Sequence, residues 1–96
     1  MKNAIIVVAT ITARPGHRVA VTAALKKAVP LVREEAGCER YDLHRDSGNP
    51  DRLVMLERWL GEEDLKNHEQ GAAFKELVRE LDGRADLSVS KLEQLI

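Results

Sequence analysis

Two segments of the sequence are apolar on both faces of an extended chain, and they constrain the fold more than any other feature. Residues 4–12 read Ala-Ile-Ile-Val-Val-Ala-Thr-Ile-Thr, and residues 52–60 read Arg-Leu-Val-Met-Leu-Glu-Arg-Trp-Leu. Because successive side chains of a strand point to opposite faces of a sheet, a strand that is apolar on both faces is covered on both. Both segments are therefore predicted to be central strands.

Helical periodicity predicts the segments between and after the strands. A stripe of Val, Leu and Ala side chains predicts a helix over residues 17–35. Pro30 lies inside this helix and removes one backbone hydrogen bond, so we expect a kink there or a split near Ala28. A second helical region covers residues 62–81, with a break at Gly71.

Two further segments alternate in polarity and predict edge strands at residues 38–46 and 87–95. The order of elements is then β-α-β-β-α-β. Right-handed crossovers place the first and third strands in the middle of the sheet, which agrees with their apolar faces. The sequence therefore predicts a ferredoxin-like α+β fold with an antiparallel sheet, and residues 1–96 form one domain.

One face of this predicted sheet has no helix to cover it. Ile6 and Val8, like Val54 and Leu56, point to that face. Leaving branched aliphatic side chains in water costs about 1.5–3 kcal/mol each. We therefore expect a homodimer in which the open sheet faces of two subunits pack together.

Composition limits the partners and the compartment. Lys and Arg total 15 against 16 Asp and Glu, for a formal net charge of −1. This balance argues against nucleic acid or an anionic membrane as the main partner, because both select basic patches. The single Cys38 cannot form an internal disulfide, which is typical of a reducing cytoplasm. Neither a signal peptide nor a membrane-spanning segment is apparent.

A carboxylate in the second apolar strand marks a candidate site. Glu57 shares one face of its strand with Leu53, Met55 and Trp59, the only tryptophan. A buried carboxylate needs a partner, so Glu57 indicates either a salt bridge or a polar spot in a pocket, where it would bond a substrate hydroxyl or His68.

His68 faces the same space from the following helix. An imidazole titrates near working pH, so His68 is a candidate general base. An equally good interpretation is that it braces the helix against the strand.

The three aromatic side chains carry the remaining site predictions. Trp59 and Phe74 are placed to sandwich a flat aromatic ligand, and Tyr41 points inward and can donate its hydroxyl to a cavity. The alternative for each is a place in the core, the commoner fate of an aromatic residue in a small domain. His17, His44 and His68 lie far apart without metal-ligand spacing, so no metal site is predicted.

Several short motifs together resemble one protein family. They are Ala13-Arg-Pro-Gly16, Glu34-Glu-Ala-Gly-Cys38 leading into Tyr41, Leu56-Glu-Arg-Trp59, Leu65-Lys-Asn-His68, and Phe74 after Gly71. The chain resembles the antibiotic biosynthesis monooxygenase (ABM) domain family, which includes small quinol monooxygenases. The resemblance implies a dimeric α+β barrel and oxidation of a small hydroxylated aromatic by O₂ without a cofactor. The haem-degrading branch carries an Asn in its first strand, whereas Ala9 and Thr10 stand here, which disfavours that activity.

The leading functional hypothesis is therefore a cofactor-independent monooxygenase acting on a quinol-type substrate, with His68 and Glu57 as catalytic residues. A fold of this kind does not fix a reaction. Two alternatives stay open: an isomerase or lyase that moves protons without O₂, and a non-catalytic ligand-binding or stress protein.

Overall fold

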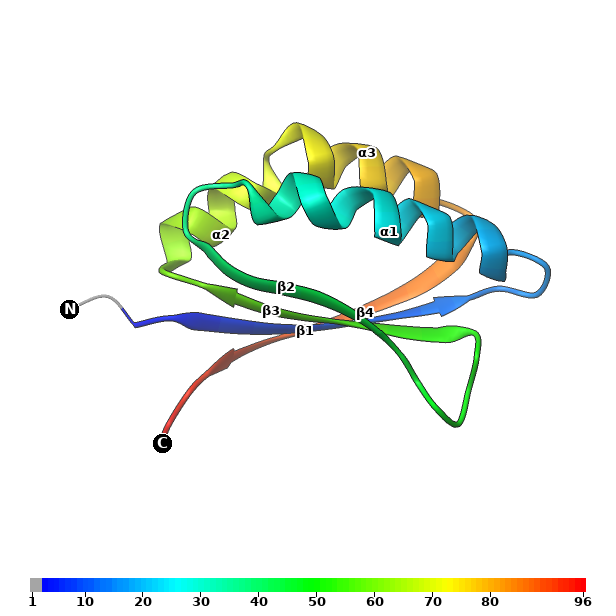
Figure 1. Ribbon diagram of the computed structural model, residues 1–96, viewed down its shortest axis with the longest axis horizontal. Helices are drawn as coiled ribbons and strands as arrows, with labels where there is room; N and C mark the ends of the chain where they lie inside the picture. Colours follow the sequence, from blue (N-terminus) through cyan, green and yellow to red (C-terminus); the bar gives the residue numbers. More distant parts are fainter. Residues whose placement is uncertain (1–2) are drawn as a thin grey trace.

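All the helices lie on one face of a four-stranded sheet (Figure 1). The computed structural model describes residues 3–96. The elements in chain order are β1 (Ile5–Ala13), α1 (Arg18–Arg33), β2 (Cys38–Arg45), β3 (Arg52–Trp59), α2 (Glu62–Glu69), α3 (Ala72–Leu81) and β4 (Ala85–Glu93). This is the predicted ferredoxin-like α+β arrangement, with the second helical region divided at Gly71 as expected.

The strand order in the sheet is β2-β3-β1-β4, and every neighbouring pair is antiparallel. The two strands that are apolar on both faces, β1 and β3, are the central pair, which confirms the prediction. Their register places Ile5 opposite Trp59 and Thr12 opposite Arg52. Side chains of the two strands therefore meet row by row on the face beneath the helices.

The core lies between that face and the helices. Alternate residues of β1 and β3 point toward the helices and are buried, which is the period of two expected of a half-covered sheet. On α1 the buried side chains recur with helical spacing. The core includes Val7, Ile11, Leu53, Met55 and Trp59 from the sheet and Val21, Leu25 and Val32 from α1.

Helix α1 continues through Pro30 as one helix, so the predicted split near Ala28 is wrong. Pro30 is exposed, and the surrounding buried stripe packs on the sheet on both sides of it. Packing of an amphipathic face contributes more to helix stability than one backbone hydrogen bond removes.

A tight turn joins α1 to β2 and ends at Gly37. This residue has φ of +78°, a conformation that L side chains rarely adopt, and a Cβ there would overlap the Asp64 side chain. Glycine at this position therefore lets the turn and the start of α2 approach closely. As a result Glu35, within the turn, comes close to α2 (see below).

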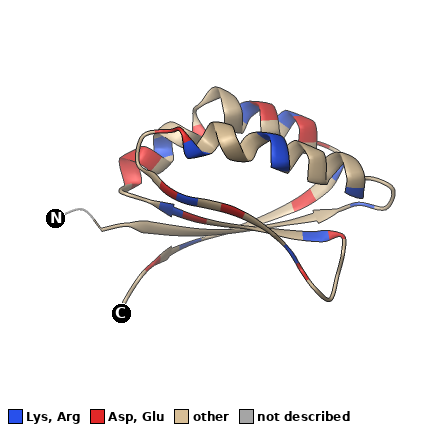
Figure 2. Ribbon diagram, in the orientation of Figure 1, with Lys and Arg blue, Asp and Glu red and all other residues tan. Residues whose placement is uncertain are grey.

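The sheet face opposite the helices carries half-buried aliphatic side chains from both central strands, among them Ile6, Val8, Val54 and Leu56. Charged residues are spread over the helices and β2, whereas β1 carries none (Figure 2). In residues 3–96, no helix is long and apolar enough to cross a membrane.

Candidate active site

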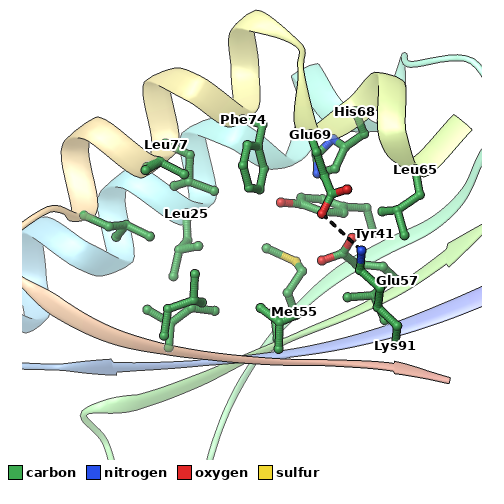
Figure 3. Close-up of a pocket in the computed structure, with 17 residues that line it drawn as sticks. Leu25, Tyr41, Met55, Glu57, Leu65, His68, Glu69, Phe74, Leu77 and Lys91 are labelled. Atoms are coloured by element: carbon green, nitrogen blue, oxygen red, sulfur yellow. Dashed lines mark ion pairs between the residues drawn. The ribbon is translucent and has the colours of Figure 1, made fainter. Parts of the chain in front are cut away.

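A cavity of about 80 Å³ lies between α3 and the helix-covered face of the sheet (Figure 3). All four strands and all three helices contribute to its wall, which is mainly apolar. A space of this size holds several water molecules. The polar side chains that reach it are Tyr41, Glu57, His68, Glu69 and Lys91.

Glu57 projects toward the cavity because the alternation of β3 points residues 53, 55, 57 and 59 toward the helices. Its Oε1 accepts a 2.9 Å hydrogen bond from Trp59 Nε1, and only 7% of the residue is exposed. Burial raises the pKa of Glu57 to about 7; the indole bond opposes the rise, and the Glu69 and Glu35 carboxylates add to it. Near neutral pH this carboxyl group therefore populates both protonation states.

His68 is buried on α2, and its Nδ1 lies 2.7 Å from Glu35 Oε1. A bond between His68 and Glu57, one of the pairings considered from the sequence, does not form: Glu57 is bonded to Trp59 and His68 to Glu35. Glu35 reaches the ring from the turn after α1, where Gly37 allows the close approach described above. With Nδ1 bound to a carboxylate, Nε2 is the nitrogen left for a ligand in the cavity.

Three aromatic rings surround the imidazole. Trp59 is stacked on His68 with ring centroids 4.5 Å apart and planes at 30°. Phe74 and Tyr41 meet the imidazole edge to face, at centroid distances of 5.2 and 5.8 Å. This packing fixes the ring against the sheet.

The predicted sandwich of a ligand between Trp59 and Phe74 does not fit this geometry, because both rings contact His68. Trp59 is fully buried and does not line the cavity, so the alternative interpretation of Trp59 as a core residue is the one the structure supports. Phe74 and Tyr41 do line the cavity. The indole therefore acts on the site indirectly, through its hydrogen bond to Glu57 and its stack on His68.

Tyr41 points its hydroxyl into the cavity from β2 (Figure 3). Burial raises the pKa of Tyr41 well above its ordinary value, and the carboxylates of Glu57 and Glu35 raise it further. The side chain therefore remains a neutral phenol at neutral pH. It can donate a hydrogen bond to an oxygen atom in the cavity.

Sequence reasoning missed three charged residues of the site: Glu35, Glu69 and Lys91. Lys91 Nζ lies 3.5 Å from Glu69 Oε2 at the polar end of the cavity. The alternation of β4 could have identified Lys91, which shares a face with Leu87 and Val89. Glu35 had no such signal, because it lies in a turn 33 residues from its partner.

The other histidines lie away from the cavity. His17 is half-buried before α1, and His44 is exposed on β2 with its Nδ1 3.1 Å from the Asp42 carbonyl oxygen. Cys38 is half-buried at the start of β2. Within the described part of the chain, no group of three or more His, Cys, Asp or Glu side chains is arranged to hold a metal ion.

Sequence and fold comparisons place these residues in a known family. The sequence profile described as "Antibiotic biosynthesis monooxygenase" matches residues 4–80, which extend from β1 into the last turn of α3 and include most of the cavity wall. The chain belongs to the antibiotic biosynthesis monooxygenase family.

Within the ABM family, the chain is 38% identical over 79 residues to the "Probable quinol monooxygenase YgiN" of Escherichia coli (strain K12), covering 72% of this chain and 76% of that protein. Its fold is similar to that of PA3566 from Pseudomonas aeruginosa, with a TM-score of 0.94 and 32% identity over 100% of this chain and 98% of that chain. Rv0793 from Mycobacterium tuberculosis has a TM-score of 0.92 at 25% identity, over 97% and 96% of the two chains.

Proposed function

We propose that this ABM-family protein is a cofactor-independent monooxygenase that oxidises a small hydroxylated aromatic, of the quinol type, with O₂. The observation that carries the proposal is one cavity that brings together a histidine held by a carboxylate, a carboxyl group titrating near neutral pH and a phenol donor, among apolar walls. The relative named as a probable quinol monooxygenase supports the substrate class.

The chemistry begins with proton removal from a hydroxyl group of the substrate. His68 Nε2 takes the proton, and the Glu35 carboxylate stabilises the imidazolium that forms. The resulting oxyanion gives up electrons to O₂ more readily than the neutral phenol does. Overall, a substrate SH₂ and O₂ give SO and H₂O, so one oxygen atom enters the product and the other leaves as water.

Glu57 and Tyr41 hold the substrate oxygens while this happens. Both side chains face the cavity on neighbouring strands, where Tyr41 is directly opposite Glu57. Tyr41 donates a hydrogen bond, and Glu57 exchanges a proton with the reacting oxygen because its pKa lies near working pH. The mainly apolar walls lower the polarity of the surroundings of the reactive anion.

Oxygen consumption tests the proposal. Purified protein, free of metal and flavin, is expected to consume O₂ with a panel of dihydroxybenzenes and naphthoquinols faster than the compounds autoxidise. His68→Ala is expected to lower kcat/KM by about 10²–10⁴-fold, whereas His44→Ala, an exposed histidine on β2, is the matched control. A His68→Ala variant as active as the parent protein would exclude the proposed base.

A second candidate function uses the same groups without O₂. His68 and Glu57 are two acid–base groups on one cavity, which is the arrangement an isomerase or lyase needs to move a proton between two atoms of a substrate. Turnover under anaerobic conditions distinguishes this candidate from the oxygenase. A ligand that raises Tm and is recovered unchanged would instead favour a binding role.

We also propose that the chain forms a homodimer through the open sheet face. All helices lie on the other face, and Val8 and Leu56 are paired at the centre of the open one. Val8→Asp is expected to give monomers in sedimentation velocity, because a charge would be buried in the interface. Val19→Asp, at an exposed position of α1, is the control. A Val8→Asp variant that sediments like the parent protein would exclude this interface.

A further inference from the structure

A polar row crosses the sheet at one end of the cavity. Backbone pairing puts Tyr41 opposite Glu57, Glu57 opposite Val7, and Val7 opposite Lys91. The row therefore joins all four strands on the face beneath the helices, with the small Val7 between the two charged side chains. All four residues line the cavity.

Lys91 supplies the positive charge of this row. Among the described residues that line the cavity, it is the only Lys or Arg. Figure 3 shows its ammonium group directed toward the polar end of the cavity, where Glu57 and Glu69 also point. It lies on β4 at the edge of the cavity, with 54% of its side chain exposed.

The ion pair that holds Lys91 is easily exchanged. Its N···O distance to Glu69 is 3.5 Å, and 37% of the Glu69 side chain is exposed, so solvent screens the attraction. Glu69 is also the last residue of α2, where the helix dipole disfavours a negative charge. A second anion that enters the cavity can therefore compete with Glu69 for the ammonium group.

The proposed reaction creates such an anion. A deprotonated substrate hydroxyl next to Glu57 carries its charge into an apolar cavity that Glu57 and Glu69 already line. An unpaired anion in such surroundings is strongly disfavoured. Tyr41 can donate a hydrogen bond but no positive charge. A protonated His68 can donate from Nε2, but the Glu35 carboxylate at Nδ1 already offsets its charge. Lys91 is the other cation that lines the cavity, and its partner Glu69 is partly exposed.

We propose that Lys91 is a substrate-binding residue that exchanges Glu69 for the oxyanion of a deprotonated phenol or quinol. The choice of ligand class rests on the proposed function, whereas the anion site rests on the geometry of the polar row. No covalent bond changes in this step: one ion pair replaces another, and Glu69 is released to solvent.

Binding of 4-nitrophenol tests the inference without any oxygen chemistry, because its phenolate is coloured and its neutral form is not. Titration of the dye against protein across a pH series gives separate affinities for the two forms. The parent protein is expected to prefer the phenolate. Lys91→Gln is expected to weaken phenolate binding about tenfold and to leave neutral phenol binding unchanged. Lys91→Arg should recover most of the phenolate affinity. The control is Lys75→Gln, which removes the same charge from an exposed position on α3.

Glu69→Gln provides an independent variant that leaves Lys91 in place. If Glu69 competes for the ammonium group, its removal strengthens phenolate binding. Unchanged phenolate affinity in Lys91→Gln, weaker binding in Glu69→Gln, or no binding by the parent protein would each overturn the inference. A protein that binds phenolate through Lys91 but consumes no O₂ would refute the oxygenase and keep the anion site.

Discussion

The two ends of the helix-covered sheet face differ in what holds them together. The apolar end is formed by buried aliphatic side chains that belong to one core cluster and have no polar partner, among them Ile11, Leu25 and Leu53. At the polar end, buried or half-buried groups occur in bonded pairs: Glu57 with Trp59, and His68 with Glu35. The apolar end supplies stability, and the polar end supplies groups that can change protonation state.

Removing volume from the apolar end is expected to give the largest effect. Leu53 is 2% exposed and faces the helix layer from β3, so Leu53→Ala is expected to lower the free energy of unfolding by about 2–5 kcal/mol. Urea denaturation measures this change. Leu60→Ala, at a half-exposed position just after β3, is expected to cost less than about 1 kcal/mol. Similar losses at the two positions would contradict the assignment of the core.

A titrating group at the polar end makes stability depend on pH. The pKa of Glu57 is raised to about 7 in the folded protein from an ordinary value of 4.5, so the folded state disfavours its charged form. The contribution of protonated Glu57 to the free energy of unfolding is therefore fully present below pH 4.5. It is lost as the pH rises to about 7, and the loss amounts to about 3 kcal/mol.

Glu57→Gln removes that dependence. Relative to the parent protein, the variant is expected to become progressively more stable between pH 4.5 and about 7, with a constant difference above that range. Unfolding free energies across the pH series measure it, and Glu63→Gln on the exposed side of α2 is the control. Parallel pH curves for parent and Glu57→Gln would show that the carboxyl group titrates normally.

The carboxylate behind His68 is expected to affect catalysis more than folding. Glu35→Gln weakens the bond that fixes the imidazole, and we expect kcat to fall about tenfold with little change in KM, because ring misplacement affects the reacting geometry. Glu34→Gln is the neighbouring exposed control. Nitrogen NMR of the imidazole should report a changed tautomer population in Glu35→Gln only. An unchanged tautomer and rate would mean that Glu35 only braces the turn.

The smallest expected effect concerns the indole donor. Trp59→Phe keeps an aromatic ring against His68 but removes the Nε1–H bond to Glu57. In the parent protein this bond lowers the pKa of the Glu57 carboxyl group. The pKa of Glu57 is therefore expected to rise by about one unit. Carbon NMR titration of the carboxyl group measures it, with Leu65→Met in the same wall as a packing control. A falling pKa would contradict the role of the indole.

The elements and their order in the sheet were predictable because they follow from local periodicity. The apolar faces of residues 4–12 and 52–60 identified the central strands, and Gly71 identified the break between α2 and α3. Pro30 does not split α1 as predicted, because a helix packed along its length tolerates one missing hydrogen bond.

The candidate site was predictable only in part. Alternation along β3 brought Glu57 inward, and the following helix brought His68 to the same cavity. Which groups would pair there was not predictable, because Glu57 could have bonded either His68 or Trp59 within reach. Glu35 belongs to one of the motifs that carry the family resemblance, but its role at the site was not predictable, since no periodicity connects a turn residue with a helix 33 positions later.

The sequence by itself determined which residues form strands and helices, which strands are central and which side chains face the core, because these depend on spacing along the chain. The tertiary structure decided that Glu35 rather than Glu57 holds His68, that Trp59 lies behind the imidazole, and that Lys91 reaches the cavity from the last strand. These contacts depend on how closely separate elements approach one another, and a close approach is set by packing across the whole domain.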